Sequence, residues 1–253
     1  MVKGLDIFKE HFKDYEKHYV LIGGAACTVA MEDAGMDFRA TSDLDIVLYV
    51  EALDRDFVEA FWIFIDKGEY ENRQKSTGKR LFYRFHTPRD VTFPKMLELF
   101  SRKPDSLDYK GTGHLTPIPI DEEISSLSAI LLNDEYYDFI HRGKRNSDGL
   151  MVVIPEYLIP LKARAWLDLN KRKEAGENID ANDINKHKND VFRLYPLLSL
   201  ENRVVLPESI KADLSKFISQ IEGGVAISLK NLGLRNTYKE EILYNLKSIY
   251  NLE

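Results

Sequence analysis

One ten-residue stretch, TSDLDIVLYV at residues 41–50, limits what this chain can fold into more than any other. From Leu44 onward it is short, apolar and rich in β-branched residues, which is typical of a buried strand. Side chains alternate along a strand, so Asp43 and Asp45 share one face while Leu44 and Ile46 share the other. Two carboxylates at such a short distance repel each other, and the repulsion raises the pKa of one of them unless a cation lies between them. The stretch therefore predicts a strand that carries a site for a hard divalent cation.

Upstream of this strand the sequence predicts a strand, a glycine turn and a helix. Residues 19–22 are apolar, Gly23 and Gly24 follow, and small helix-compatible residues fill positions 25–34. Glycines let the backbone approach a ligand closely, and the free N–H groups at a helix start favour phosphate. A Gly-Gly pair that stands alone is more often a plain tight turn, so its meaning depends on the acids beside it.

The rest of the chain divides into a mixed part and a mostly helical part. Two prolines within residues 115–120 mark a connection or an edge strand. We expect an α+β protein: a mixed, partly antiparallel sheet flanked by helices at residues 1–120, then a mostly α-helical domain at 121–253 that closes over a cleft. Hydrophobic periodicity predicts helices over 7–18, 54–67, 126–140, 155–173, 180–198, 207–221 and 237–250, and strands over 80–86, 96–100 and 151–154.

Composition excludes several classes of protein. Hydrophobic residues make up 44% of the chain, yet no apolar run reaches the ~18 residues of a membrane span, so we expect no membrane association. The net charge of -6 argues against an overall electrostatic grip on nucleic acid, although it allows a local basic patch. Cys27 is the only cysteine and is expected to be a small buried packing residue. The start lacks a signal sequence, which favours the cytoplasm.

Glu98 is the candidate for a third acid in the same site. Its side chain should face opposite to those of Leu97 and Leu99, and a buried strand rarely carries an unpaired acid at its centre. Glu98 lies either on a solvated face or beside Asp43 and Asp45. Three carboxylates on neighbouring strands would hold the two metal ions that phosphoryl or nucleotidyl transfer uses, while the glycine turn cradles phosphates. Glu98, or whichever carboxylate lies nearest the attacking hydroxyl, is then the candidate general base.

These motifs resemble a known family. Gly23-Gly-Ala-Ala followed by Arg39-Ala-Thr-Ser-Asp-Leu-Asp-Ile46 is similar to the signature of the DNA-polymerase-β-like nucleotidyltransferase superfamily, a Gly-Gly or Gly-Ser turn and then Asp-x-Asp. The greatest similarity is to the branch of abortive-infection and type IV toxin nucleotidyltransferases. That branch carries an Arg-x-Thr/Ser before the aspartates, which Arg39 and Thr41 match, and a third acid on a later strand, which Glu98 matches.

The resemblance continues into the second part of the chain. Lys162, in Pro160-Leu-Lys-Ala-Arg-Ala, matches a lysine on a helix of the second domain. Lys186-His-Lys-Asn-Asp190 matches a later Arg-Asp-type motif only loosely, because a Lys-His pair stands where Arg-Asp is usual. The resemblance implies that Asp43, Asp45 and Glu98 bind metal and act in catalysis with Lys162, and that nucleotide contacts Gly23, Gly24, Arg39, Thr41, Lys162, Lys186 and Asp190.

The function implied is metal-dependent transfer of a nucleoside monophosphate from a nucleoside triphosphate to an acceptor hydroxyl, with release of pyrophosphate. The resemblance implies two Mg²⁺ ions, with Mn²⁺ as an alternative. A tRNA 3′ end, a protein hydroxyl and a small molecule are all compatible acceptors, and the toxin branch adds a cognate antitoxin as a partner. Two other functions stay open: a catalytically silent nucleotide-binding or interaction module on the same fold, and a metal-dependent phosphohydrolase.

Each site residue also has a structural interpretation. The two aspartates could be solvated acids at a strand start, and Arg39 could be a surface residue. Lys162 could be a lysine at the rim of a cavity with its stem on apolar surface. His187 is expected on the helix surface or near phosphate, because no second histidine stands at metal-ligand spacing. The basic run at residues 171–173, with Lys162 and Arg164, is either a local patch for RNA or a solvated helix end.

Overall fold

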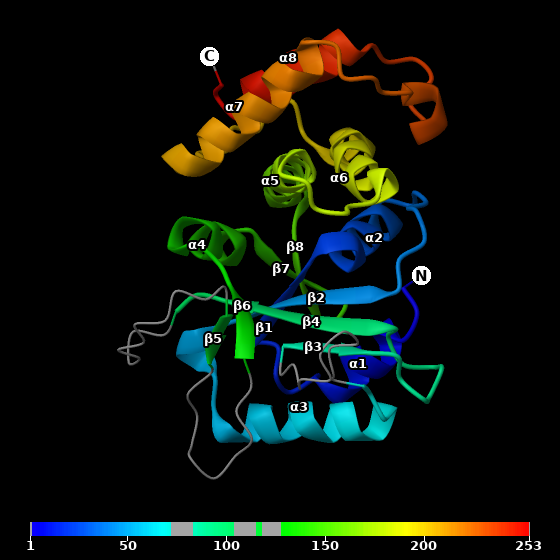
Figure 1. Ribbon diagram of the computed structural model, residues 1–253, viewed down its shortest axis with the longest axis vertical. Coiled ribbons are helices and arrows are strands. Elements are labelled where there is room, and N and C mark those ends of the chain that lie inside the picture. The colour runs from blue at the N-terminus through cyan, green and yellow to red at the C-terminus, as the bar shows by residue number, and fades with distance from the viewer. Residues whose placement is uncertain (1, 72–82, 104–114, 118–127, 253) are drawn as a thin grey trace.

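The computed structural model describes residues 2–71, 83–103, 115–117 and 128–252, with the backbone only at 115–117 and 128–131. Its centre is a mixed sheet with the strand order β5-β6-β4-β2-β1-β8-β7 (Figure 1). A further strand, β3, pairs antiparallel with the first half of β4, ahead of the point where β6 joins. The strands are β1 (Tyr19–Ile22), β2 (Asp43–Leu48), β3 (Arg84–His86), β4 (Met96–Ser101), β5 (Leu115–Pro117), β6 (Ser128–Leu131), β7 (Lys144–Ser147) and β8 (Leu150–Val153).

Helices cover both faces of this sheet (Figure 1). Helices α1 and α3 lie on one face, α2, α4 and α5 lie on the other, and α6, α7 and α8 form an outer layer around α5. The helices are α1 (Leu5–His11), α2 (Gly23–Asp33), α3 (Arg55–Gly68), α4 (Asp134–Arg142), α5 (Pro155–Glu174), α6 (Ala181–Leu194), α7 (Glu208–Glu222) and α8 (Lys239–Ile249). Short 3-10 turns occupy η1 (Val50–Ala52), η2 (Tyr195–Leu197) and η3 (Leu229–Leu232).

Helix α3 covers one face of the sheet with the apolar residues that recur at helical spacing in its sequence. Asp54 caps its start by accepting a hydrogen bond of 2.9 Å from the backbone N–H of Phe57. Phe57, Phe61 and Phe64 recur at helical spacing and are buried on the face toward the sheet. Phe64 packs against Phe12 beside α1, with ring centroids 5.3 Å apart. This aromatic layer supports the sheet face opposite to the predicted acids.

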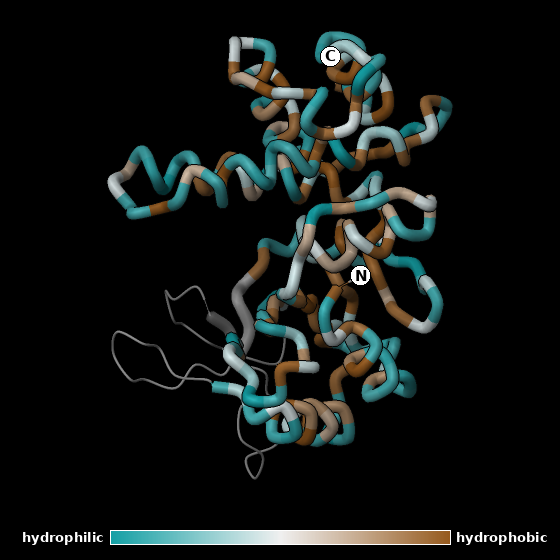
Figure 2. The backbone as a smooth tube through the Cα atoms, turned by 90° about the vertical axis from the view of Figure 1, so that its right-hand side faces the viewer, coloured by the Kyte–Doolittle hydropathy of each residue, from teal (hydrophilic) through white to brown (hydrophobic). Residues whose placement is uncertain are grey.

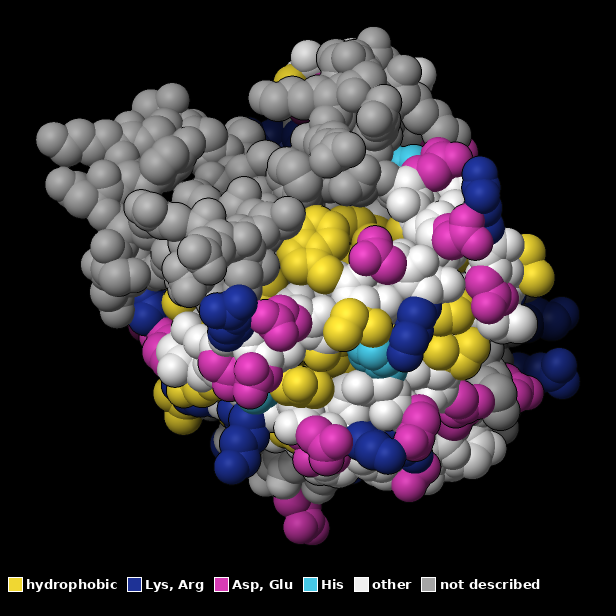
Figure 3. All heavy atoms as spheres, turned by 90° about the horizontal axis from the view of Figure 1, so that it is seen from below, with side chains coloured by type: hydrophobic (Ala, Val, Ile, Leu, Met, Phe, Trp, Pro, Cys, Tyr) yellow, Lys and Arg dark blue, Asp and Glu magenta, His cyan; other side chains and the backbone are white. Residues whose placement is uncertain are grey.

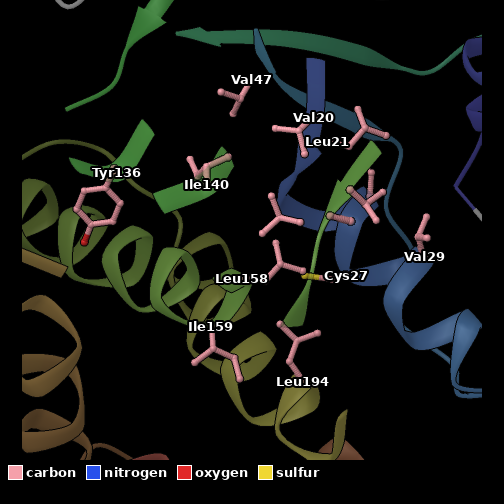
Figure 4. Packing of buried hydrophobic residues seen from close by; sticks show 14 of the residues in the cluster. Val20, Leu21, Cys27, Val29, Val47, Tyr136, Ile140, Leu158, Ile159 and Leu194 are labelled. Atoms are coloured by element: carbon pink, nitrogen blue, oxygen red, sulfur yellow. The ribbon is translucent and has the colours of Figure 1, made fainter. Parts of the chain in front are cut away.

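The other sheet face packs on α2 and α5. Figure 4 shows Cys27 of α2 next to Leu158 of α5, with Val20 of β1 in the same cluster, and all three are fully buried. Helix α5 in turn packs against α6 and α7. Cys27 is thus the buried packing residue that the sequence predicted. In Figure 2 brown and teal alternate along the helices, as expected for elements with one apolar face.

The helix predicted over 7–18 is shorter than expected, because α1 ends at His11 and turns follow it. Of the strand predicted over 80–86, β3 forms at Arg84–His86, and residues 80–82 lie outside the described residues.

Two other predictions of secondary structure were wrong. The helix predicted over 126–140 is instead strand β6 followed by the shorter helix α4, because residues 128–131 pair with β4 and β5. Strand β7 was missed because its sequence, Lys-Arg-Asn-Ser, is polar. Asp148 and Gly149 connect it to β8, both with positive φ, at 48° and 78°. An Asp-Gly pair between two strands is a hairpin signal that could have revealed β7.

The sheet changes how the chain is divided. The predicted boundary near residue 120 lies outside the described residues, and strands β6, β7 and β8 beyond it join the same sheet as β1, β2 and β4. The mixed part therefore extends to Val153, and the mostly helical part begins at Pro155 with α5. The α+β class with a mixed, partly antiparallel sheet is confirmed. Among the helices of the described ranges, we find none with the length and apolar character needed to span a membrane.

Candidate active site

Strand pairing places the predicted acids on one face of the sheet. Strand β2 lies between β1 and β4, and the register aligns Asp45 with Ile22 on one side and with Glu98 on the other. Asp43 lies two residues before Asp45 and so shares its face. The intervening Leu44 is completely buried toward the opposite layer, as the alternation predicted. The acids thus face α2 and α5.

The glycine turn lies directly against these acids. Gly23 begins α2 with a φ of 66°, and a Cβ at this position would collide with the Asp45 carboxylate. A Cβ on Gly24 would come within 2.6 Å of Thr41 Oγ1. Only glycine fits both positions, because the start of the helix approaches β2 too closely for a side chain. The N–H groups at the start of α2 are therefore next to Asp45.

A cavity of about 440 Å³ opens at this point. Strand β2, the start of α2, strand β4 and helices α5 and α6 all contribute to its wall. Nine of the ten sequence-predicted site residues line it: Gly23, Gly24, Arg39, Thr41, Asp43, Asp45, Glu98, Lys162 and Lys186. The tenth, Asp190, lies behind the wall, fully buried, and holds two of these residues in place.

The surroundings of Asp45 disfavour its ionised carboxylate. Burial raises the pKa of its carboxyl to about 6, the negative charges of Glu98 and Asp43 add to this rise, and Lys162 opposes it. The carboxylate accepts no hydrogen bond from any residue in the described ranges. A half-buried carboxylate without a donor, flanked by two more acids, is an arrangement that a bound cation would stabilise.

Glu98 has a partner that the sequence did not reveal. Arg84 on β3 lies opposite Glu98 in the β3–β4 register, and its Nε donates a hydrogen bond of 2.6 Å to Oε1. A second guanidinium nitrogen of Arg84 also contacts this oxygen. The Glu98 side chain is only 12% exposed, so it belongs to the cavity wall and not to a solvated face.

The three acids differ in how well they fit a metal ion. No group of three or more His, Cys, Asp or Glu side chains in the described part of the chain is placed to hold an ion as it stands. Asp43 and Asp45 supply carboxylate oxygens on one face of β2, the ligand type that Mg²⁺ and Mn²⁺ accept. Glu98 is paired with Arg84. The residues present therefore fit a divalent ion at the two aspartates, and Glu98 fits only if it releases Arg84.

Asp190 on α6 connects the two parts of the chain. Arg39, in the segment before β2, donates to it through Nε at 2.9 Å and Nη2 at 2.7 Å. Lys162 Nζ on α5 lies 3.1 Å from the same carboxylate, and Arg193 Nη1 donates to it at 3.1 Å. Burial alone would raise the pKa of Asp190, but Lys162 and Arg39 outweigh it and lower the pKa.

Lys162 and Arg39 are therefore structural cations as well as cavity residues. The Lys162 side chain is 4% exposed, which is far less than a rim lysine would show. Burial alone would lower the pKa of Lys162, but Cys27, Asp190 and Asp45 together raise it, so its ammonium stays charged. Arg39 keeps 25% of its side chain exposed and reaches both Asp190 and the cavity.

His187 lines the same cavity as a neutral imidazole. Burial lowers its pKa to about 3, and the charges of Lys162 and Lys186 contribute. Its Nδ1 is buried and has no hydrogen-bond partner in the ranges that the structure covers. His187 thus lies inside the site, close to the cations that would contact phosphate. Its neighbour Lys186 pairs with Asp183 at 2.9 Å.

The basic run after Lys162 does not join the site. Arg164 donates to Asp213 on α7, and Arg172 pairs with Glu177. The three side chains at 171–173 are exposed at the end of α5. This segment has the form of a solvated helix end, which is the plainer of the two sequence interpretations.

Comparison with known proteins gave only distant likenesses. No family model matches the sequence, and no curated protein matches it. Among solved structures, the polyadenylate synthase of Megavirus is 14% identical, with a TM-score of 0.37 over 87% of this chain and 36% of that one. JHP933 from Helicobacter pylori is 12% identical, with a TM-score of 0.39 over 98% of this chain and 86% of that one. This chain thus spans about a third of the length of the viral protein.

Proposed function

We propose that this chain is a metal-dependent nucleotidyltransferase that moves a nucleoside monophosphate from a nucleoside triphosphate to an acceptor hydroxyl and releases pyrophosphate. One observation carries the proposal: Asp45, paired in register with Glu98, touches the glycine turn at the start of α2 within a single cavity. The acids that would hold a cation and the backbone that would hold a phosphate are therefore neighbours. A nucleoside triphosphate with its cation presents both groups at once.

The phosphate side of the site is formed by backbone and by buried cations. The first turn of α2 offers free N–H groups at Gly23 and Gly24, where the helix dipole also favours an anion. Lys162 and Arg39 add two positive charges that Asp190 fixes in position. Because these donors are placed before any ligand binds, they can orient a triphosphate with little loss of side-chain entropy.

The acid side would hold the cation and the acceptor. Asp43 and Asp45 would bind a Mg²⁺ or Mn²⁺ ion, and such an ion neutralises charge on the triphosphate as the bond to pyrophosphate breaks. The proton of the attacking hydroxyl would pass to Glu98 or to the carboxylate nearest to it. Asp45, with its pKa near 6, also lies close to the range in which a carboxylate exchanges protons at neutral pH.

The acceptor is the least constrained part of the proposal. Among the described side chains on the face shown in Figure 3, basic and acidic residues are interspersed with apolar ones and form no broad basic surface for a long nucleic acid. A tRNA 3′ end, a protein hydroxyl and a small molecule each need only a local contact. If the acceptor is tRNA or a protein of the host cell, an antitoxin that blocks the cavity is the matching partner.

Mass spectrometry of acceptor pools tests this proposal. RNA, protein and small-molecule pools are incubated with the protein, Mg²⁺ or Mn²⁺, and each of the four triphosphates in turn. We expect one pool to gain the mass of a nucleoside monophosphate. Asp45→Asn should lose this gain, whereas Asp14→Asn, which removes an exposed acid outside the cavity, should keep it.

The same experiment separates the two other functions. A silent nucleotide-binding module would bind triphosphate and leave every pool unmodified. A phosphohydrolase would release phosphate or nucleoside monophosphate, again without a modified acceptor. Either result from the unaltered protein would overturn the proposed transfer.

A further inference from the structure

Arg84 forms a salt bridge with Glu98, the third acid of the site. It stands opposite Glu98 in the β3–β4 register, and two of its guanidinium nitrogens contact Glu98 Oε1. The planar guanidinium is charged at all physiological pH values and gives fixed, directional hydrogen bonds. The contact is partly shielded from water, with 12% of the Glu98 side chain exposed against 43% of that of Arg84. A permanent positive charge is thus built into the place where the sequence predicted a metal-bound carboxylate.

The two aspartates lack such a partner. Asp45 accepts no hydrogen bond within the described residues, although Glu98 lies beside it in the β2–β4 register. Asp43 accepts one from Ser42 at 3.2 Å, which brings no positive charge. Glu98 therefore has a cationic hydrogen-bond partner within the described residues, whereas Asp45 and Asp43 have none.

Charge counting gives the same division. Asp43, Asp45 and Glu98 carry three negative charges when ionised. Arg84 and one divalent ion together carry three positive charges, so that this set is neutral. In the protein without a triphosphate, two divalent ions beside Arg84 would leave the set with two excess positive charges, next to the further cation Lys162.

We propose that Arg84 takes the place of one of the two metal ions, so that the site binds a single divalent ion at Asp43 and Asp45. Arg84 is then a positioning residue: it holds Glu98 in the cavity wall and excludes a second ion from that carboxylate. This inference rests on the proposed function, because the ion is expected to bind together with a nucleoside triphosphate. A site with one ion is the alternative to the two ions that the family resemblance implies.

Counting bound Mn²⁺ tests the inference without any measurement of activity. Electron paramagnetic resonance reports free Mn²⁺ during titration of the protein with a triphosphate analogue whose α–β bridge is methylene. After subtraction of the Mn²⁺ held by unbound analogue, we expect a total of one Mn²⁺ per chain in the complex of protein and analogue. Arg84→Gln should raise this number to two, and the double variant Arg84→Gln with Glu98→Gln should return it to one.

Two further variants test whether loss of any arginine, or only loss of the cation beside Glu98, changes the number of bound ions. Arg89→Gln removes an exposed arginine that pairs with Glu69 outside the cavity, and it should leave the number at one. Arg84→Lys keeps a cation beside Glu98 and should also bind one ion, which keeps the test decisive if Arg84→Gln does not fold.

The results that overturn the inference are clear. Two ions in the unaltered protein or in Arg84→Lys would show that a cation at Glu98 does not exclude metal. One ion in a folded Arg84→Gln protein would show that Arg84 is not the cause. The predicted ion counts without transfer to any acceptor would refute the proposed function and leave the role of Arg84 intact.

Discussion

At the scale of single residues, Asp45 shows a conflict between stability and function. Its pKa in the folded protein, about 6, lies above the value of 3.8 for a solvated aspartate. The folded state therefore holds a proton more tightly than the unfolded state does. Stability is gained as pH falls from above 6 toward 4, and it is lost as pH rises through the same window. At neutral pH without metal, the ionised Asp45 destabilises the fold.

Asp45→Asn should separate the two effects. At pH 8 without metal, we expect the free energy of unfolding to rise by about 1 kcal/mol, well below the full value of the shift because the side chain is only half-buried. Near pH 4.5 the gain should shrink, since Asp45 itself is then largely protonated in the folded state. Urea unfolding at both pH values measures this. A variant less stable than the natural protein at pH 8 would refute the strain assigned to Asp45.

Two half-buried histidines with buried ring nitrogens make an opposite contribution to stability. His187 on α6 and His141 on α4 have pKa values lowered to about 3 and about 4, in both cases mainly by burial. The unfolded chain takes up protons on these residues near pH 6.5 while the folded protein does not. The stability that depends on their neutral forms is therefore present above about pH 6.5 and is lost as pH falls below it.

His187→Asn and His141→Asn should each flatten this acid sensitivity. Between pH 7 and pH 5 we expect each variant to lose about 1 kcal/mol less stability than the natural protein. Because the two residues lie on different helices, the effects should add in the double variant. Thermal unfolding across this pH range gives the comparison. Equal pH dependence in all four proteins would contradict the account.

At the scale of elements, α5 continues through an internal proline because a distant residue compensates for it. Pro160 has no N–H, which leaves the carbonyl of Glu156, four residues earlier, without its usual helical donor. The Tyr250 hydroxyl, just after α8, donates to this carbonyl at 2.7 Å. The helix that carries Lys162 is thus stabilised by the end of the described chain.

Tyr250→Phe should therefore destabilise the protein through α5. The lost hydroxyl leaves a buried carbonyl unpaired, which costs about 1–2 kcal/mol. In a Pro160→Ala background, the restored N–H can reach Glu156, so the same change should cost clearly less. A double-mutant cycle by chemical unfolding measures this coupling. Equal costs in both backgrounds would mean that Tyr250 does not compensate for Pro160.

The sequence predicted the elements that are determined by residues close together in the chain. The glycine turn and the alternating acids of β2 follow from neighbouring residues, whereas Lys162 was identified through the family resemblance, and the structure places all of them in one cavity. Arg84 and the central position of Asp190 were missed. Both depend on partners 14 and 151 residues away, which are set by strand register and by the docking of α6. Hydrophobic periodicity carries no information about such contacts.

At the scale of the whole molecule, Asp190 unites the sheet and the helical part around one charge. It pairs with Arg39 before β2, with Lys162 on α5 and with Arg193 on its own helix. Removing one partner of a buried charge network leaves the others uncompensated, and the usual cost is about 3–5 kcal/mol. The network also fixes the two cations assigned to the triphosphate.

Asp190→Ala should accordingly lower both the free energy of unfolding, by about 3 kcal/mol, and the affinity for a triphosphate analogue. The control is Glu222→Gln at the end of α7, because Glu222 pairs with Lys247 at the surface and neither residue lines the cavity. That variant should stay within about 0.5 kcal/mol of the natural protein. Chemical unfolding and calorimetric titration provide the two readouts. Unchanged affinity in a destabilised Asp190→Ala protein would limit the network to a structural role.

The central claim is that the cavity between β2, α2 and α5 transfers a nucleoside monophosphate. One reaction with two labels tests it most directly, using a triphosphate labelled at the α-phosphate in one sample and at the γ-phosphate in the other, with Mg²⁺ and the acceptor pool that gains mass. The account predicts that the α label moves to the acceptor while an equal amount of γ label appears in pyrophosphate, and that Asp45→Asn abolishes both. The claim would be contradicted if the α label appeared only in free nucleotide, or if Asp45→Asn transferred it undiminished.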